Sequence, residues 1–163
     1  MKRVDFENGS VTRNIFSVAL PMLVAQILSL LYNIVDRIYI ARIPEVGTVA
    51  LGAVGLCFPL IMIITAFANL FGSGGTPLFS ISRGMQENQK AQLIMDTSFT
   101  MVCVSGMVLM VLGLLFARPL LVIFGASEDG LGYAYPYMMI YLIGTVPSMI
   151  ATGMNPFINA QGY

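Results

Sequence analysis

The fold of this chain is decided by residues 26–36, QILSLLYNIVD. Gln26, Ser29, Asn33 and Asp36 are spaced 3, 4 and 3 residues apart. On a helix they fall within roughly 80° of one another, and the rest of the circumference is apolar. A charged residue at the centre of a membrane helix costs roughly 2.5–3.5 kcal/mol on insertion scales, so this stripe needs a polar partner or water.

Composition places the whole chain in a membrane. Its 163 residues are 57% hydrophobic and 10% charged, whereas soluble domains have about 25% charged residues. So few charges do not cover a soluble surface, and we expect an all-α membrane protein. The net charge is zero and no basic cluster occurs, which excludes nucleic acid as a partner.

The absence of histidine excludes several kinds of site. It removes histidine metal sites, histidine general bases and Ser-His-Asp chemistry. Cys57 and Cys103 lie in apolar runs without Cys-x-x-Cys spacing, and we expect two buried, reduced thiols. We therefore expect no cofactor and no enzymatic activity.

Charged residues divide the chain into four apolar runs, each long enough for one crossing of a ~30 Å hydrocarbon layer. The first run exceeds the ~7–15 residues of a signal-peptide core, so we expect a retained helix. Gly72–Pro77 predicts a kink in the second helix, beside either a cavity or a closely packed neighbour. The expected helices, which form part of a six-helix lobe by the resemblance given below, cover about residues 12–42, 47–82, 92–117 and 131–160.

Polar stripes recur on two further helices. The fourth helix has polar residues at spacings of 3 and 4, and the second has a shorter series around Asn69. The third helix carries Gly106 and Gly113 but no Asn, Gln or charge in its apolar run, and we expect it to be a lipid-facing support. The residues expected to line a shared polar cavity are Gln26, Ser29, Tyr32, Asn33, Asn69, Tyr137, Tyr141, Ser148 and Asn155.

Two alternatives remain open for these stripes. Interhelical hydrogen bonds, worth ~0.6 kcal/mol each on average, would explain the polar residues without any cavity. Asp36 lies six residues from Arg42, about 9 Å along a helix, so it could also sit at the membrane interface. If it is buried, a protonation or Na⁺ switch is the usual task of such a carboxylate.

Several segments resemble one transporter family. The quoted helix extends to residues 20–39, LPMLVAQILSLLYNIVDRIY, and is followed by LGAVGLCFP at 51–59. The segment 72–84 and NPFINAQG at 155–162 also fit. Over nearly its whole length the chain resembles the multidrug and toxic compound extrusion (MATE) family of efflux transporters. Two departures are Ala41, where glycine is frequent, and Asn159, where arginine is frequent.

The resemblance implies a function. Family members have about twelve membrane helices in two six-helix lobes and exchange H⁺ or Na⁺ for organic cations and amphipathic drugs. Pro21 would be the point where the first helix bends, and Asp36 the coupling-ion residue, with Na⁺ as one candidate ligand. The chain would correspond to two-thirds of one lobe, with the remaining helices of the transporter and membrane lipid as partners.

Two other functions, a flippase and a scaffold, fit the charges and polar stripes less well. A lipid-linked oligosaccharide flippase would need a basic cavity, but only Arg37 among the basic residues lies inside an apolar run. A small four-helix scaffold without transport would not need polar stripes. The basic residues are biased five to three toward the amino-terminal side, which predicts a cytoplasmic amino terminus in a bacterial cell membrane.

Overall fold

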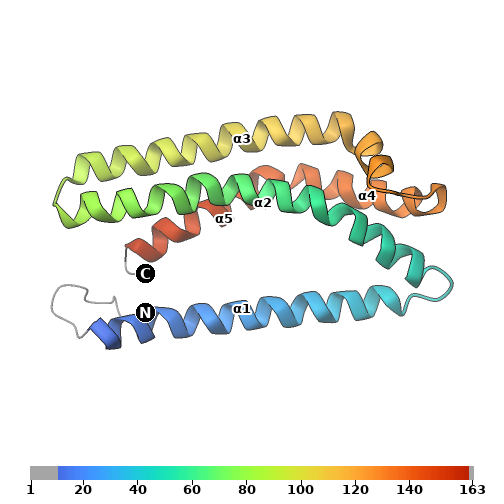
Figure 1. The fold of residues 1–163 in the computed structure, drawn as a ribbon, viewed down its shortest axis with the longest axis horizontal. Coiled ribbons are helices and arrows are strands. Elements are labelled where there is room, and N and C mark those ends of the chain that lie inside the picture. Colours follow the sequence, from blue (N-terminus) through green and yellow to red (C-terminus); the bar gives the residue numbers. More distant parts are fainter. Residues whose placement is uncertain (1–10, 162–163) are drawn as a thin grey trace.

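The computed structural model describes residues 11–161, which form an all-α protein without strands in that range (Figure 1). Three helices are long and apolar enough to cross a membrane, and a bent helix pair makes a fourth span if it is counted as one. The predicted all-α membrane fold is confirmed. The helices are α1 (Val11–Ala41), α2 (Gly47–Gly84), α3 (Asn88–Ile123), α4 (Glu128–Ile143) and α5 (Thr145–Ala160).

The last span is two helices, so the prediction of a single helix over residues 131–160 is wrong. The axes of α4 and α5 meet at 58° with a break at Gly144. Pro147 lies in the first turn of α5 and cannot donate the backbone hydrogen bond that would continue the ladder from α4. The bend therefore occurs where a glycine and a proline together weaken the helix.

At Gly72–Pro77, where a kink is predicted, α2 continues as one helix from Gly47 to Gly84, and the kink stays a prediction. Figure 1 shows its curvature in the earlier, teal-to-green part, while the later part follows α3 closely. A Cβ atom on Gly72 would lie 2.7 Å from the Cα atom of Gly153 on α5. The small residues therefore allow a close helix–helix crossing, the second of the two alternatives given above.

The core lies where α2, α3 and the α4–α5 pair meet. Cys57, Ala68, Val102, Met138 and Met149 are almost fully buried there. The Cys57 thiol also donates to the carbonyl of Ala134 at 3.6 Å, which joins α2 to α4. Large apolar side chains point outward over most of the surface, as a lipid environment requires.

α3 is more central than expected from its composition. It packs against α2, α4 and α5 through a face of small residues, and Leu142 of α4 fills the space beside Gly113. It begins at Asn88 and continues to Ile123, beyond the expected 92–117. Asp96 lies within this helix.

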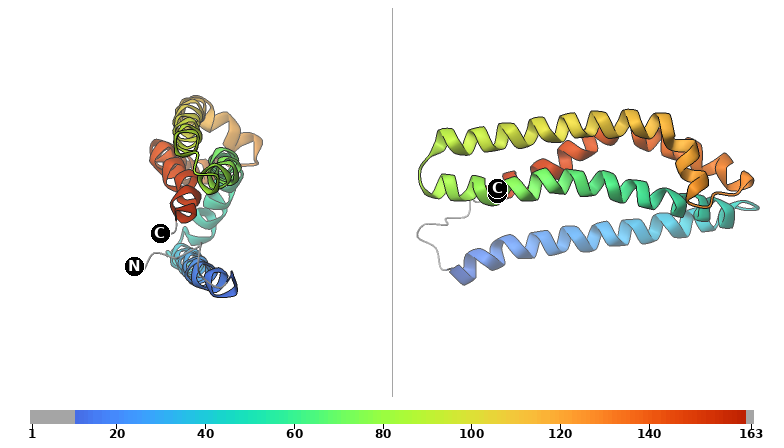
Figure 2. Two further views of the ribbon diagram at one scale, coloured as in Figure 1. Left: turned by 90° about the vertical axis from the view of Figure 1, so that its left-hand side faces the viewer. Right: turned by 45° about the horizontal axis from the view of Figure 1, so that its top comes forward.

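α1 stands apart from this core. Figure 2, seen end-on, shows it below the cluster of the other helices, and among the helices of residues 11–161 only α2 packs against it. None of the residues in its most apolar stretch is buried. The connection to α2 is tight, since a Cβ atom on Gly47 would lie 2.8 Å from the carbonyl carbon of Ala41, and Glu45 has a φ of 68°.

The Gly72–Gly153 crossing gives a stability prediction. In Gly72→Ala the new methyl group meets backbone atoms that have no rotamer to change, so overpacking should lower the free energy of unfolding by about 1–3 kcal/mol. In the matched variant Gly74→Ala, on the same helix, the methyl group meets nothing within 4 Å. Thermal melting of the detergent-solubilised protein should separate the two variants, and equal melting temperatures would contradict the crossing.

Candidate functional site

The polar stripe of α1 remains uncovered by the other helices. Gln26, Ser29, Asn33 and Asp36 are all exposed. Asn33 uses its Nδ2 to donate to the carbonyl of Ser29 at 2.8 Å, a bond within its own helix. In residues 11–161, no hydrogen bond joins this stripe to another helix. Its side chains are therefore not used as interhelical links within this part of the chain.

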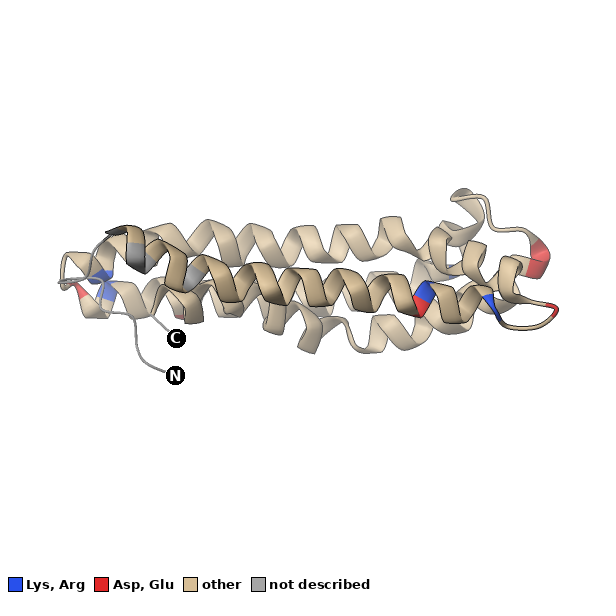
Figure 3. Ribbon diagram, turned by 90° about the horizontal axis from the view of Figure 1, so that it is seen from below, with Lys and Arg blue, Asp and Glu red and all other residues tan. Residues whose placement is uncertain are grey.

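Asp36 has no ionic partner in the described part of the chain, where the single ion pair is Lys90–Glu87 at 3.1 Å. Figure 3 shows the other coloured residues in view near the two ends of the molecule, with one acidic and one basic residue adjacent on α1. These are Asp36 and Arg37. The guanidinium carbon of Arg37 lies 5.2 Å from the ring centroid of Phe58 on α2, so Arg37 is directed at that ring.

Two tyrosines lie near this carboxylate. Tyr137 of α4 is within electrostatic range of Asp36 and of Tyr32 on α1. The start of α4 is fixed by Ser127, whose hydroxyl accepts from the backbone N–H of Gly130 at 3.2 Å. This cap satisfies one of the free backbone N–H groups at the start of the helix that carries Tyr137.

The remaining residues of the predicted cavity are less closely connected. Tyr141 interacts with the side chain of Ser148 across the α4–α5 bend. Asn155 accepts from Asn159 at 3.4 Å within α5, and Asn69 is exposed on α2. Tyr137 is therefore on the side of α4 that lies within electrostatic range of Tyr32 and Asp36, and Tyr141 lies near Ser148.

Three site predictions are left untested by this arrangement. The shared cavity stays a prediction, because no hydrogen bond connects Gln26, Asn69 or Asn155 to another helix within residues 11–161. Pro21 lies inside an uninterrupted α1, so its role as a bend point also stays a prediction. No group of three or more Cys, Asp or Glu side chains that could hold a metal occurs among the described residues, and Na⁺ at Asp36 likewise stays a prediction.

Two features of the site were missed by sequence reasoning. The first is the contact of Arg37 with Phe58, which turns the cation away from its neighbouring carboxylate. Phe58 lies about three turns inside α2. A single aromatic ring in an apolar run gives no periodic signal, so only the fold reveals the pair. The second is Ser98, a buried hydroxyl on the helix that was expected to be a simple support.

The profile of the MatE family matches residues 21–163 of this sequence. The chain belongs to the MatE family. The matched range includes all of α2 and the residues Tyr32, Asp36 and Tyr137. Among solved structures, none matches the chain.

Curated relatives of this MatE chain are longer than it is. Multidrug export protein MepA of Staphylococcus haemolyticus is 27% identical over 157 residues, covering 96% of this chain and 34% of the relative. MepA of Staphylococcus aureus is 23% identical over 157 residues, with the same coverage. The FAD transporter of Shewanella oneidensis is 26% identical over 137 residues, covering 84% of this chain and 30% of the relative. The chain thus spans about a third of the length of the relatives it matches.

Cysteine accessibility tests whether the stripe of α1 lines a wet path. With Cys57 and Cys103 replaced by alanine, Ser29→Cys and Asn33→Cys in the membrane-embedded protein should react with a charged, impermeant thiol reagent. The matched variants Ile27→Cys and Ile34→Cys, on the apolar side of the same helix, should not react because lipid excludes the reagent. Equal labelling of all four positions would refute a one-sided polar path.

Proposed function

We propose that this chain forms part of an efflux transporter that exports organic cations and amphipathic drugs in exchange for H⁺ or Na⁺. Membership of the MatE family and relatives named multidrug export proteins support a transporter rather than an enzyme. Because the chain spans about a third of those relatives, the remaining helices of the transporter are its obligatory partners in this proposal.

The observation that carries the proposal is the carboxylate of Asp36, which has no ionic partner among the described residues. It lies on an apolar helix, it is exposed, and the adjacent cation Arg37 is directed at Phe58. A carboxylate in that position is neutralised by a proton, by Na⁺ or by the positive charge of a drug. These occupants exclude one another, and that exclusion is what couples export of one cation to entry of another.

The tyrosines near Asp36 suit organic cations. The faces of Tyr32 and Tyr137 offer cation–π attraction worth about 0.5–2 kcal/mol, depending on desolvation. Both rings also supply apolar area for amphipathic drugs. Gln26, Ser29 and Asn33 continue the polar surface along α1 toward Pro21.

α1 is the helix best placed to move in this mechanism. It contacts only α2, whereas the other helices pack against at least two neighbours each. Pro21 leaves one carbonyl of α1 without its helical donor, so bending there breaks no hydrogen bond. A change of charge on Asp36 would then shift α1 between two positions relative to the rest.

The charge of the site argues against two other substrates. FAD, the substrate named for one relative, carries phosphates, and a lipid-linked oligosaccharide carries a pyrophosphate. Either would require cations beside the cavity residues. The guanidinium of Arg37, the basic residue next to Asp36, instead lies over the ring of Phe58. A cationic or neutral amphipathic substrate fits this environment better than an anion.

The location follows from the same proposal. The transporter lies in a bacterial cell membrane with lipid around its outer faces. The amino terminus is cytoplasmic, because basic residues are more frequent on that side. Asp36 is then near the opposite, external side, since it lies close to the α1–α2 connection.

Replacing the carboxylate tests the proposal. Asp36→Asn in the full-length transporter should be expressed normally, because an amide is easier to bury than a charge. It should lose drug efflux driven by an imposed H⁺ or Na⁺ gradient, because an amide neither takes up a proton nor neutralises Na⁺ or a cationic drug. Efflux is measured as the decrease of a fluorescent organic cation in inverted membrane vesicles.

The matched control is Asp96→Asn, which removes an exposed helical carboxylate from α3. It should leave gradient-driven efflux close to that of the unchanged transporter. Comparing H⁺ with Na⁺ gradients in the control identifies the coupling ion. Normal efflux by Asp36→Asn at equal expression would leave Asp36 as an interfacial carboxylate and reject the coupling role.

A further inference from the structure

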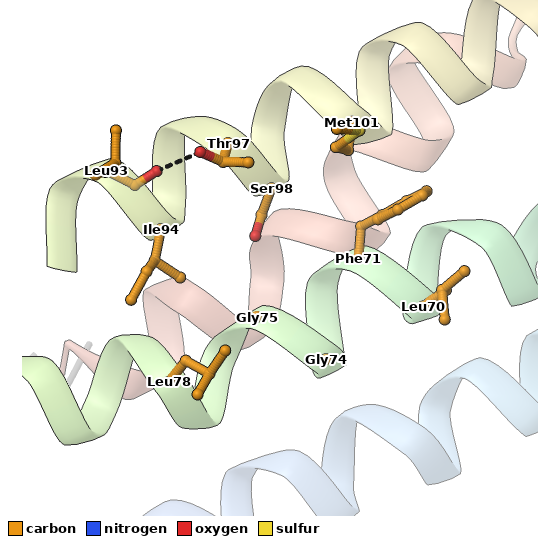
Figure 4. A pocket seen from close by; sticks show the side chains of 10 residues that line it. All are labelled: Leu70, Phe71, Gly74, Gly75, Leu78, Leu93, Ile94, Thr97, Ser98 and Met101. Carbon is orange, nitrogen blue, oxygen red and sulfur yellow. Dashed lines mark hydrogen bonds between the residues drawn. The ribbon is translucent and has the colours of Figure 1, made fainter. Parts of the chain in front are cut away.

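A groove runs between α2 and α3 on the side of the hairpin shown in Figure 4. Its volume is about 390 Å³, and its walls are almost entirely apolar. It spans nine residues of each helix, 70–78 and 93–101, which corresponds to about 12 Å along the helix axes. The lining residues used below are Leu70, Gly74, Gly75, Leu93, Ser98 and Met101.

Ser98 is the unusual member of this lining. It is 8% exposed, and its hydroxyl has no hydrogen-bond partner among the described residues. Its neighbours Thr97 and Thr100 instead donate to carbonyls of their own helix, at 2.7 and 2.8 Å. Figure 4 shows the Ser98 hydroxyl directed between the helices, toward Gly75. A Cβ atom at Gly75 would collide with it, so this glycine makes the space for the hydroxyl.

The Ser98 oxygen remains reachable from the groove. In the described part of the chain, no side-chain oxygen or nitrogen is both sealed from a water-sized probe and without a partner. An unpartnered donor in an apolar groove favours a ligand that brings an acceptor.

Charges on α3 give the depth of this hydroxyl in the membrane. The uncharged segment between Asp96 and Arg118 has 21 residues, or about 31 Å of helix, which equals the thickness of the hydrocarbon layer. Ser98 therefore lies just inside the boundary at the Asp96 end. The first turns of α3, including Lys90, extend into the headgroup region, and Lys90 shares its helix face with Ile94 and Thr97 of the groove.

We propose that this groove binds a membrane glycerophospholipid. One acyl chain lies between α2 and α3, and an ester carbonyl of the lipid accepts a hydrogen bond from Ser98. Lys90 lies toward the phosphate, although it also pairs with Glu87 at 3.1 Å. Cation, hydroxyl donor and apolar groove follow one another along α3 in the order in which a phospholipid carries phosphate, ester and acyl chain.

The choice of a lipid over a drug rests on the groove itself. No charged side chain lines it, whereas an organic cation would need a carboxylate or several aromatic faces. The groove also runs along the helix axes, and acyl chains in a membrane have that direction. This site is separate from Asp36, so its occupation does not depend on the proposed coupling mechanism.

Photochemical labelling tests the site in the full-length protein. The protein is reconstituted in vesicles of phosphatidylethanolamine and phosphatidylglycerol that contain a phospholipid with a photoactivatable acyl chain. Labelled peptides are then mapped by mass spectrometry. We expect the label to concentrate at Leu70–Leu78 and Leu93–Met101, above the level on the apolar side of α1.

Filling the groove should remove that excess. In Gly74→Leu the new side chain starts from a position with nothing within 4 Å, so it enters the groove without a backbone collision. The matched variant Gly55→Leu has equal space on the same helix but lies outside the groove, and should keep the label. Thermal melting and gel-filtration profiles of both variants show whether either has lost its fold.

The hydroxyl is tested by a second pair of variants. Ser98→Ala should lower labelling at subsaturating probe about fivefold, the factor expected from losing one ordinary hydrogen bond. Ser105→Ala is the control, because its hydroxyl is already bonded to Met101 and Val102 carbonyls of α3.

Three results would overturn the proposal. The first is a label spread evenly over all lipid-exposed helix surfaces, which would mean only a general lipid shell. The second is an absence of label at the groove, which would mean that another helix of the transporter covers it. The third is displacement of the label by an exported drug but not by excess phospholipid, which would make the groove a drug site.

Discussion

The structure depends on one backbone contact, the crossing of α2 and α5 at Gly72 and Gly153. A side chain at Gly72 would enter the backbone of α5, and one at Gly153 would meet Ala68 and Val102 at 3.1 Å. Because lipid is as apolar as leucine, close packing of this kind holds membrane helices together in place of the hydrophobic effect. The crossing fixes α5 against both α2 and α3, and the bend at Gly144 then determines where α4 lies.

A consequence of this packing is the separate position of α1. The tight crossings join the other helices into one unit, whereas α1 is attached near its carboxyl end, by the turn at Gly47 and the Arg37–Phe58 contact. Asp36 lies beside that attachment. In our proposal a charge change there acts where α1 joins the packed unit, which is why we assign the coupling step to this residue.

The sequence predicted the class of fold and the polar stripe, since run length and periodicity are properties of single helices. It did not predict the bend at Gly144, although Gly144–Pro147 contains the same weak helix formers as Gly72–Pro77. What separates them is tertiary: Gly72 has a backbone partner that needs its missing side chain, whereas Gly144 does not. Ser98 was overlooked for the same reason, because a lone serine in an apolar run gives no pattern until Gly75 is seen opposite it.

We propose that α1 moves while the other helices stay fixed, and distances between spin labels measure this movement. In the full-length transporter with Cys57 and Cys103 replaced by alanine, labels at Thr100 and Thr152 report on α3 and α5, and labels at Ser29 and Thr152 report on α1 and α5. We predict one narrow distance distribution for the first pair under all conditions, and a shift for the second pair when pH or Na⁺ changes. A fixed distance between Ser29 and Thr152, with a shifting distance between Thr100 and Thr152, would contradict the account.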